Sequence, residues 1–246
     1  MKEAKPDWWL LGLCSSRVCT YLVFMTYAAT LSVVQKEWQM SSAAAGSISS
    51  GFQIGYAISL VVFSVLADRI GAKRVFLLSN LLTAIAALLF AAFARGYYSA
   101  LLLYTLVGIS MGGTYPPALM MIAGRYPIRG LGKAVGAFIA STSLSYALSL
   151  GISGLVLSSD GYHTSFLLTC LGPSVGSLLA WSTVRSTPNR VFPREEEQKF
   201  STEILRKRHA VLYIAGYGFH SWELLGMWAW TPAFLAICLT ASGSGA

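Results

Sequence analysis

The sequence predicts an all-α fold, a polytopic bundle of transmembrane helices. Of its 246 residues, 55% are hydrophobic and only 11% are charged, and the mean hydropathy is +0.59. A soluble chain of this length has no core large enough to bury so much apolar surface. The chain also contains long apolar stretches separated by short polar turns. The environment that fits this sequence is lipid.

The apolar stretches define seven predicted membrane spans. A helix needs roughly 20 mostly apolar residues to cross a hydrocarbon core about 30 Å thick. The stretches lie near residues 8–34, 43–66, 75–94, 99–122, 133–157, 164–184 and 210–238. Because none shows the alternation of polar and apolar residues that a membrane barrel strand requires, each is expected to be a helix.

The lysines and arginines predict the orientation of these spans. Fifteen of the 18 basic residues lie near the N terminus or around the loops after the second, fourth and sixth spans. The opposite loops hold only Lys36 and Arg95, and Arg17 lies within the first span. Because basic loops stay cytoplasmic, we expect a multi-pass protein of the cell (inner) membrane with a cytoplasmic N terminus. The net charge of +8 then reflects contact with anionic lipid, and no nucleic-acid partner is expected.

The polar segments divide the chain into three predicted parts. Residues 1–184 form an N-terminal six-helix transmembrane bundle. Residues 185–209 carry two prolines, a run of glutamates and a run of basic residues, and are expected to be a charged cytoplasmic linker. Residues 210–246 contain the seventh span and a glycine- and serine-rich tail, which is expected to be flexible.

A compact charged turn separates the second and third spans. It contains Asp68, Arg69, Gly71, Lys73 and Arg74. Gly71 allows a tight turn, and the basic side chains after it can pair with a carboxylate or with the negative end of a neighbouring helix. We interpret these five residues as a candidate cytoplasmic gate, which holds one side of a two-state protein shut. The alternative is a basic turn that only sets the topology.

This turn resembles the signature loop of the major facilitator superfamily of secondary transporters. In that family the loop reads Gly, three residues, Asp, Arg or Lys, any residue, Gly, any residue, and two basic residues. Here Ser64 replaces the leading glycine, and the other positions match through Arg74. The resemblance implies a six-helix half and alternating access around a midplane site. It also implies that residues 210–246 hold the first helix of an incomplete C-terminal bundle, whose partner is a missing half or a second copy.

Two departures from the family pattern concern coupling. Tyr104 occupies the position where the family often has an arginine that serves a proton relay, and the fifth span lacks a Gly-Pro pair. These departures argue against drug/proton antiport. The neighbouring Gly108, Gly112 and Gly113 predict close helix contact, followed by a kink before Pro116.

Arg17 is the centre of the predicted substrate site. A charge inside a span costs roughly 2.5 to 3.5 kcal/mol on insertion scales and marks a functional site by default. Tyr21 lies one turn further on the same face, and Gln53 and Tyr56 share a face of the second span. A guanidinium fork flanked by hydroxyl groups can recognise a carboxylate-like anion. The predicted substrate-binding set is completed by Tyr115 and Trp222. The alternative is that Arg17 is purely structural and that the substrate is neutral or cationic.

The seventh span carries the other ionisable groups. Tyr213, Tyr217, His220 and Glu223 follow a helical spacing and form one polar stripe. Because buried histidine and carboxyl groups can titrate near neutral pH, His220 and Glu223 are candidates for proton coupling. The alternatives are a hydrogen bond between helices or an ion pair between Glu223 and Arg17.

The sequence points to no cofactor, metal site or enzymatic activity. The four cysteines lie in predicted spans at spacings that suit neither a disulfide framework nor a zinc site, and no phosphate-binding loop is present. Residues 151–154 match the Gly-x-Ser-Gly pattern of rhomboid proteases, which gives an intramembrane serine protease as one alternative. Ser153 and His220, its required dyad, are however expected at different depths of the membrane.

The predicted function is therefore membrane transport. We expect the protein to move a small organic or inorganic anion by alternating access, with proton symport as a candidate energy source. The alternative is a non-transporting fragment that associates with other helices.

Overall fold

The computed structural model describes residues 7–191 and 206–241, and every regular element within them is helical. Seven segments of this described part are long and apolar enough to cross a membrane. They are Trp8–Glu37, Ser42–Ile70, Ala72–Phe93, Tyr97–Arg125, Ile128–Leu157, Gly161–Val184 and Arg208–Leu239. Their ends differ by only a few residues from the predicted stretches. The predicted fold class is confirmed, and the chain is a multi-pass membrane protein.

Two of the spans are broken helices. The first consists of α1 (Trp8–Tyr21), the short 3₁₀ helix η1 (Leu22–Phe24) and α2 (Thr26–Glu37). The fourth consists of α5 (Tyr97–Met111), η2 (Gly112–Thr114) and α6 (Pro116–Arg125). The second, third and seventh spans are α3 (Ser42–Ile70), α4 (Ala72–Phe93) and α9 (Arg208–Ala241). The fifth and sixth both belong to α7 (Ile128–Val184), which turns at Gly161, where φ is 76°.

The break in the fourth span has the predicted cause. Pro116 and Pro117 open α6 and cannot donate backbone hydrogen bonds to the preceding turn, so α5 ends at Met111 and a short 3₁₀ turn at the glycine pair follows it. The break in the first span has no proline or glycine. Its freed carbonyl groups are instead satisfied by hydroxyl groups: Ser149 donates to Leu22 O at 2.5 Å and Tyr104 donates to Phe24 O at 2.7 Å.

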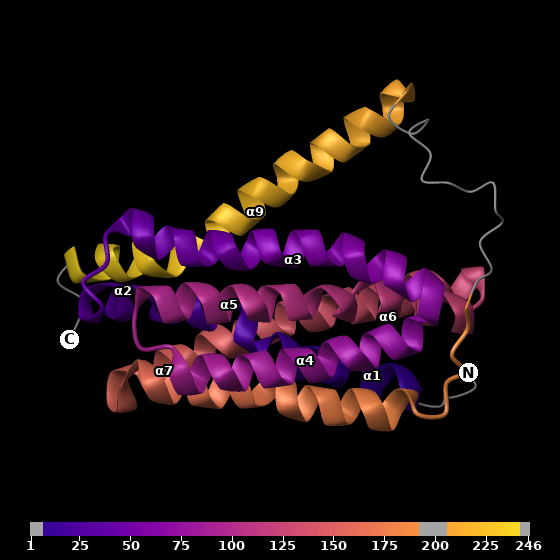
Figure 1. Cartoon of the computed structure of the whole chain (residues 1–246), viewed down its shortest axis with the longest axis horizontal. Helices are drawn as coiled ribbons and strands as arrows, with labels where there is room; N and C mark the ends of the chain where they lie inside the picture. Colours follow the sequence, from indigo (N-terminus) through magenta and orange to yellow (C-terminus); the bar gives the residue numbers. More distant parts are fainter. Residues whose placement is uncertain (1–6, 192–205, 242–246) are drawn as a thin grey trace, which may run out of the picture.

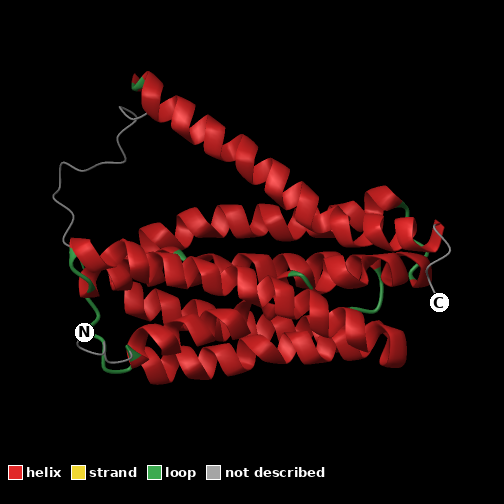
Figure 2. Ribbon diagram, turned by 180° about the vertical axis from the view of Figure 1, so that it is seen from behind, coloured by secondary structure: helices red, strands yellow, loops and turns green. Residues whose placement is uncertain are grey.

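The spans form a bundle with one divergent helix. Figure 1 shows α1, α4 and α7 side by side and α3 over α5, in agreement with the strongest packing pairs, which are α1 with α7 and α3 with α5. The last part of α9 lies against α2, and its first part rises away from α3 in both views (Figures 1 and 2). The first six spans therefore surround a common core, whereas α9 touches that core near one end only.

Glycines bring the backbones of neighbouring spans into contact. A Cβ atom on Gly108 would lie 2.3 Å from the carbonyl oxygen of Phe52, and one on Gly112 would lie 2.6 Å from the carbonyl carbon of Ser59. In the same way, Gly176 meets the first span, where a Cβ atom would lie 2.9 Å from Ser16 O. These distances are too short for any side chain. The predicted close contact at Gly108 and Gly112 is confirmed, and it joins the second and fourth spans.

The Gly112 contact can be tested by adding one methyl group. Because the new Cβ atom of Gly112→Ala would meet backbone atoms, which cannot turn away, we expect the free energy of unfolding to fall by about 1–3 kcal/mol. Gly136→Ala is the matched control, since its Cβ atom would meet nothing within 4 Å and alanine favours helix. Thermal unfolding of the detergent-purified variants measures both. Equal melting temperatures for the two variants would contradict this account of the helix contact.

Candidate functional site

Arg17 lies inside the first span with its guanidinium group enclosed by aromatic rings. Its side chain is 7% exposed, and the guanidinium carbon lies 4.1 Å, 4.5 Å and 4.8 Å from the ring centroids of Tyr21, Phe138 and Tyr115. Nε donates a hydrogen bond to Thr142 Oγ1 at 2.5 Å. Within the described residues, the buried NH1 atom has no hydrogen-bond partner. The guanidinium group of Arg17 is thus covered on its faces and bonded at Nε, while its NH1 atom remains available to donate to a ligand.

Hydroxyl groups from three spans meet beside this arginine. The hydroxyl oxygen of Tyr21 lies 3.1 Å from that of Tyr56 and 3.1 Å from Thr114 Oγ1. Tyr21 itself covers one face of the Arg17 guanidinium. We call these residues the Arg17 cluster: Arg17, Tyr21, Tyr56, Thr114, Tyr115, Phe138 and Thr142. The cluster offers positive charge and hydroxyl donors from the first, second, fourth and fifth spans, which is the donor set that a carboxylate accepts.

An aromatic group borders the cluster on the side of α9. The ring centroids of Phe24 and Tyr146 lie 4.7 Å apart, and Trp228 of α9 lies 5.0 Å from Tyr146 and 6.2 Å from Phe24. A void of only about 20 Å³ remains here, and Phe24, Gln53 and Trp228 are among the residues that line it. That volume holds about one water molecule. The aromatic side chains therefore fill the space next to the cluster in this conformation.

The structure brings together four of the six predicted substrate-binding residues: Arg17, Tyr21, Tyr56 and Tyr115. Gln53 lines the small void, and its buried Oε1 atom has no hydrogen-bond partner within the described part. Trp222 does not join them, since it is 78% exposed on α9. The tryptophan of α9 that reaches the aromatic group is Trp228, which lies more than one turn further along that helix.

The sequence reasoning missed the contribution of the fifth span. Phe138, Thr142 and Tyr146 lie on one face of α7, four residues apart, and contact Arg17 or Phe24. The spacing of an aromatic, a hydroxyl and a second aromatic residue was a usable signal. It was hidden because small and apolar residues surround these positions and because no charged residue marks that face.

The candidate proton-coupling residues lie outside this cluster. His220 and Glu223 are both exposed on α9, so their coupling role stays a prediction. The protease dyad does not form: Ser153 is buried, its Oγ atom has no hydrogen-bond partner in the described ranges, and its carbonyl group accepts from Ser165 at 3.3 Å. Among the described residues, no three histidine, cysteine, aspartate or glutamate side chains gather as a metal site would require.

The charged turn between α3 and α4 is fixed to the end of α7. Gly71 has a φ of +96°, which favours glycine, and its N–H donates to Ala67 O at 2.9 Å. Lys73 Nζ donates to the carbonyl groups of Arg185 at 2.7 Å and Thr187 at 2.8 Å. Of the two partners predicted for the basic residues, Lys73 thus takes the negative end of a helix.

The other charged residues of the turn differ in exposure. Asp68 is partly buried, and Arg69 and Arg74 are exposed. Asn189 donates from Nδ2 to Ile70 O at 2.8 Å, so the segment after α7 also contacts the turn. The backbone of the turn is therefore held in place, while its exposed arginines are free to meet a partner surface.

Comparisons with known proteins agree with this architecture. The quinolone resistance transporter of Acinetobacter baumannii is 32% identical over 161 residues, which cover 62% of this chain and 36% of that protein. The hexuronate transporter of Bacillus subtilis (strain 168) is 24% identical over 238 residues, which cover 92% of this chain and 56% of that protein. The chain therefore spans between about a third and just over half of the length of these two relatives.

The fold is also similar to a solved structure. The crystal structure of a bacterial homolog to the human lysosomal transporter Spinster, in an inward-facing and unoccupied conformation, matches with a TM-score of 0.74 and 18% sequence identity. The match covers 94% of this chain and 56% of that chain. A model of the Major Facilitator Superfamily matches residues 13–244, nearly the whole sequence. The chain belongs to the Major Facilitator Superfamily.

Proposed function

We propose that this chain serves in the transport of a small organic anion across the membrane and that the Arg17 cluster binds the anion. The observation that carries the proposal is the unpaired NH1 atom of a buried arginine. A charged donor that is buried without a partner costs at least about 1–3 kcal/mol, and a carboxylate oxygen recovers that cost. An arginine with only a structural role is expected to donate hydrogen bonds from both ends of its guanidinium group.

The surroundings of Arg17 favour an organic anion over an inorganic one. Three rings cover the guanidinium, and the neighbouring Phe24, Tyr146 and Trp228 present apolar surface. A bare inorganic anion would gain nothing from these rings, whereas an organic acid can place its carboxylate on Arg17 and its carbon skeleton on the rings. Hexuronate, the substrate named for one relative, is a carboxylate of this kind.

Alternating access is proposed for the six-helix bundle acting with a second bundle. In this family fold the solute site lies between two halves that rock against each other. The predicted division, with a bundle to residue 184, a linker at 185–209 and a further helix after it, is part of the proposal. We also propose the predicted orientation in the cell (inner) membrane, in which the N terminus and the ends that carry Lys73, Arg125 and Arg185 face the cytoplasm.

Two further roles belong to the proposal. His220 and Glu223 would carry protons on the exposed face of α9, where a second bundle would enclose them. Asp68, Arg69, Gly71, Lys73 and Arg74 would form the cytoplasmic gate, in which Lys73 fixes the turn to α7 and the exposed charges meet the second bundle. Both roles are supported by the positions of these residues on α9 and in the α3–α4 turn.

Anion binding can be measured on the detergent-purified chain by thermal shift. We expect galacturonate to raise the melting temperature of the wild type and galactose, which lacks the carboxylate, to leave it unchanged. Arg17→Gln should abolish the galacturonate shift, because the amide has no charge, and Arg17→Lys should keep part of it. The loss corresponds to at least about a tenfold weaker affinity.

Arg129→Gln is the matched control, since it removes an exposed arginine at an end of a span. It should retain the full shift. Equal galacturonate shifts in the wild type and in Arg17→Gln would refute the proposed site. If benzoate raises the melting temperature and galacturonate does not, the Arg17 cluster remains the proposed site, and its proposed substrate becomes an aromatic acid.

The gate can be tested by Asp68→Asn in proteoliposomes that hold the six-helix bundle together with its second bundle. If Asp68 and its neighbours hold one side shut, the variant should lower galacturonate uptake by roughly tenfold, the value of one charged hydrogen bond, without changing the melting temperature. Glu37→Gln, an exposed carboxylate near the end of α2, is the control and should transport like the wild type. If uptake is unchanged in Asp68→Asn, the gate proposal is wrong, and the turn only sets the topology of the spans.

A further inference from the structure

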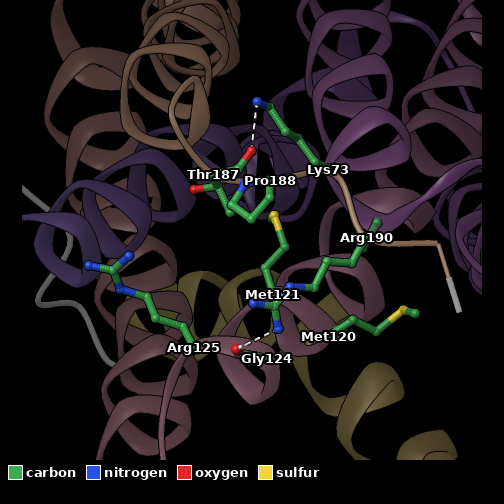
Figure 3. A pocket seen from close by; sticks show the side chains of 9 residues that line it. Lys73, Met120, Met121, Gly124, Arg125, Thr187, Pro188 and Arg190 are labelled. Atoms are coloured by element: carbon green, nitrogen blue, oxygen red, sulfur yellow. Dashed lines mark hydrogen bonds between the residues drawn. The ribbon is translucent and has the colours of Figure 1, made fainter.

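A second cavity, distinct from the Arg17 cluster, opens where α4 begins and α6 ends. Its volume is about 260 Å³, and the segment after α7 closes its third side (Figure 3). Among the residues that the structure describes, nine line it, of which three are cations and none is acidic. The cations are Lys73, Arg125 and Arg190. A cavity of this composition attracts an anion. The proposed transport site does not use it, and Lys73 is the one residue that it shares with the proposed gate.

Two of the three cations, Lys73 and Arg190, are held by carbonyl groups and have no carboxylate partner within the described residues. Lys73 Nζ makes two hydrogen bonds to carbonyl groups, which leaves its third N–H free. Arg190 donates from NH1 to Gly124 O at 3.2 Å, and this carbonyl group likewise removes no charge. Figure 3 shows the Arg190 side chain reaching to Gly124 beneath Met121, while Arg125 turns away from it. The Arg125 guanidinium lies 4.8 Å from the Trp9 ring centroid. Lys73 and Arg190 therefore supply the charge, and Arg125 marks the rim.

A neutral donor completes the cavity. Thr187 Oγ1 accepts a hydrogen bond from Trp9 Nε1 at 3.0 Å, so its own hydroxyl proton can point to a ligand. Thr187, Lys73 and Arg190 thus place a hydroxyl, an ammonium and a guanidinium donor around one cavity. Met120 and Met121 also line this cavity. Tetrahedral phosphate oxygens accept from several donors at once and bind lysine and arginine strongly.

The position of the cavity indicates the source of the phosphate. Ala72 is the first residue of α4 and Arg125 is the last residue of α6, so the cavity lies at the ends of two membrane spans, at the level of the lipid headgroups. Basic pockets between spans at this level bind anionic headgroups. The methionines offer apolar contact on the membrane side of the charges.

We propose that this cavity binds a phosphate group, supplied by the headgroup of an anionic phospholipid. The bound phosphate bridges Lys73 of α4 and Arg190 of the segment after α7, and it thereby ties the α3–α4 turn, the end of α6 and the end of α7 together. The site stands independently of the anion proposed for Arg17.

Native mass spectrometry of the full chain in a neutral detergent tests the site. With phosphatidylglycerol added, we expect one lipid that survives mild activation on the wild type and a rise in melting temperature. Phosphatidylcholine, whose headgroup carries no net charge, should give neither. Arg190→Gln should bind phosphatidylglycerol about tenfold more weakly, while it can still donate to Gly124 O. Arg129→Gln, an exposed arginine that does not line the cavity, should behave like the wild type.

The responses to the two phosphate sources decide between a lipid site, a site for a soluble phosphate and no site. A shift with inorganic phosphate alone that Arg190→Gln removes would keep the phosphate site and assign it to a soluble ligand. Equal retention of phosphatidylglycerol by the wild type and Arg190→Gln, or no response to either phosphate source in a folded protein, would overturn the proposal. Because neither readout uses galacturonate, a failure here leaves the Arg17 proposal unaffected.

Discussion

The burial of one guanidinium group inside the membrane is the constraint on which the rest of this structure depends. An arginine at that depth costs roughly 2.5 to 3.5 kcal/mol on insertion scales. Each ring that covers the Arg17 guanidinium returns about 0.5–2 kcal/mol, and the Thr142 hydroxyl returns a charged hydrogen bond. The rings come from three spans, since Tyr21 lies on the first, Tyr115 on the fourth and Phe138 on the fifth. The cost is offset only when these spans converge, so the charge and the fold require each other.

The breaks in the first and fourth spans lie where the spans converge. The first break begins directly after Tyr21, and the second ends at Thr114, directly before Tyr115. Both breaks therefore adjoin residues of the Arg17 cluster. A broken helix frees carbonyl groups, which in lipid must find donors. Buried hydroxyl groups such as those of Ser149 and Tyr104 supply them, which explains why Tyr104 stands where the family often has arginine: here the position supports a helix break and not a charge.

The sequence could predict the spans and the position of the buried charge, but not its enclosure. Apolar length determined the seven spans, and Arg17, Tyr21 and Tyr56 followed from charge and helical spacing. The structure brings Trp228 of α9, and not Trp222, to the aromatic group, because the face of α9 that meets the bundle depends on how this helix packs, which no local pattern records. Phe138 and Thr142 were missed for a similar reason. Their importance comes from the contact between the first span and α7, at a separation of more than one hundred residues.

The element that connects the two candidate sites is α6. It has ten residues, about 15 Å of helix. It begins beside Tyr115, whose ring covers Arg17, and it ends at Gly124 and Arg125 in the basic cavity. Because this helix is short and opens with two prolines, a displacement at one end can reach the other end without bending. If an anion on Arg17 draws Tyr115 toward itself and α6 shifts with it, the Gly124 carbonyl group that holds Arg190 shifts as well. The two proposed ligands would then be coupled through α6, and by linkage each would change the affinity for the other by the same factor.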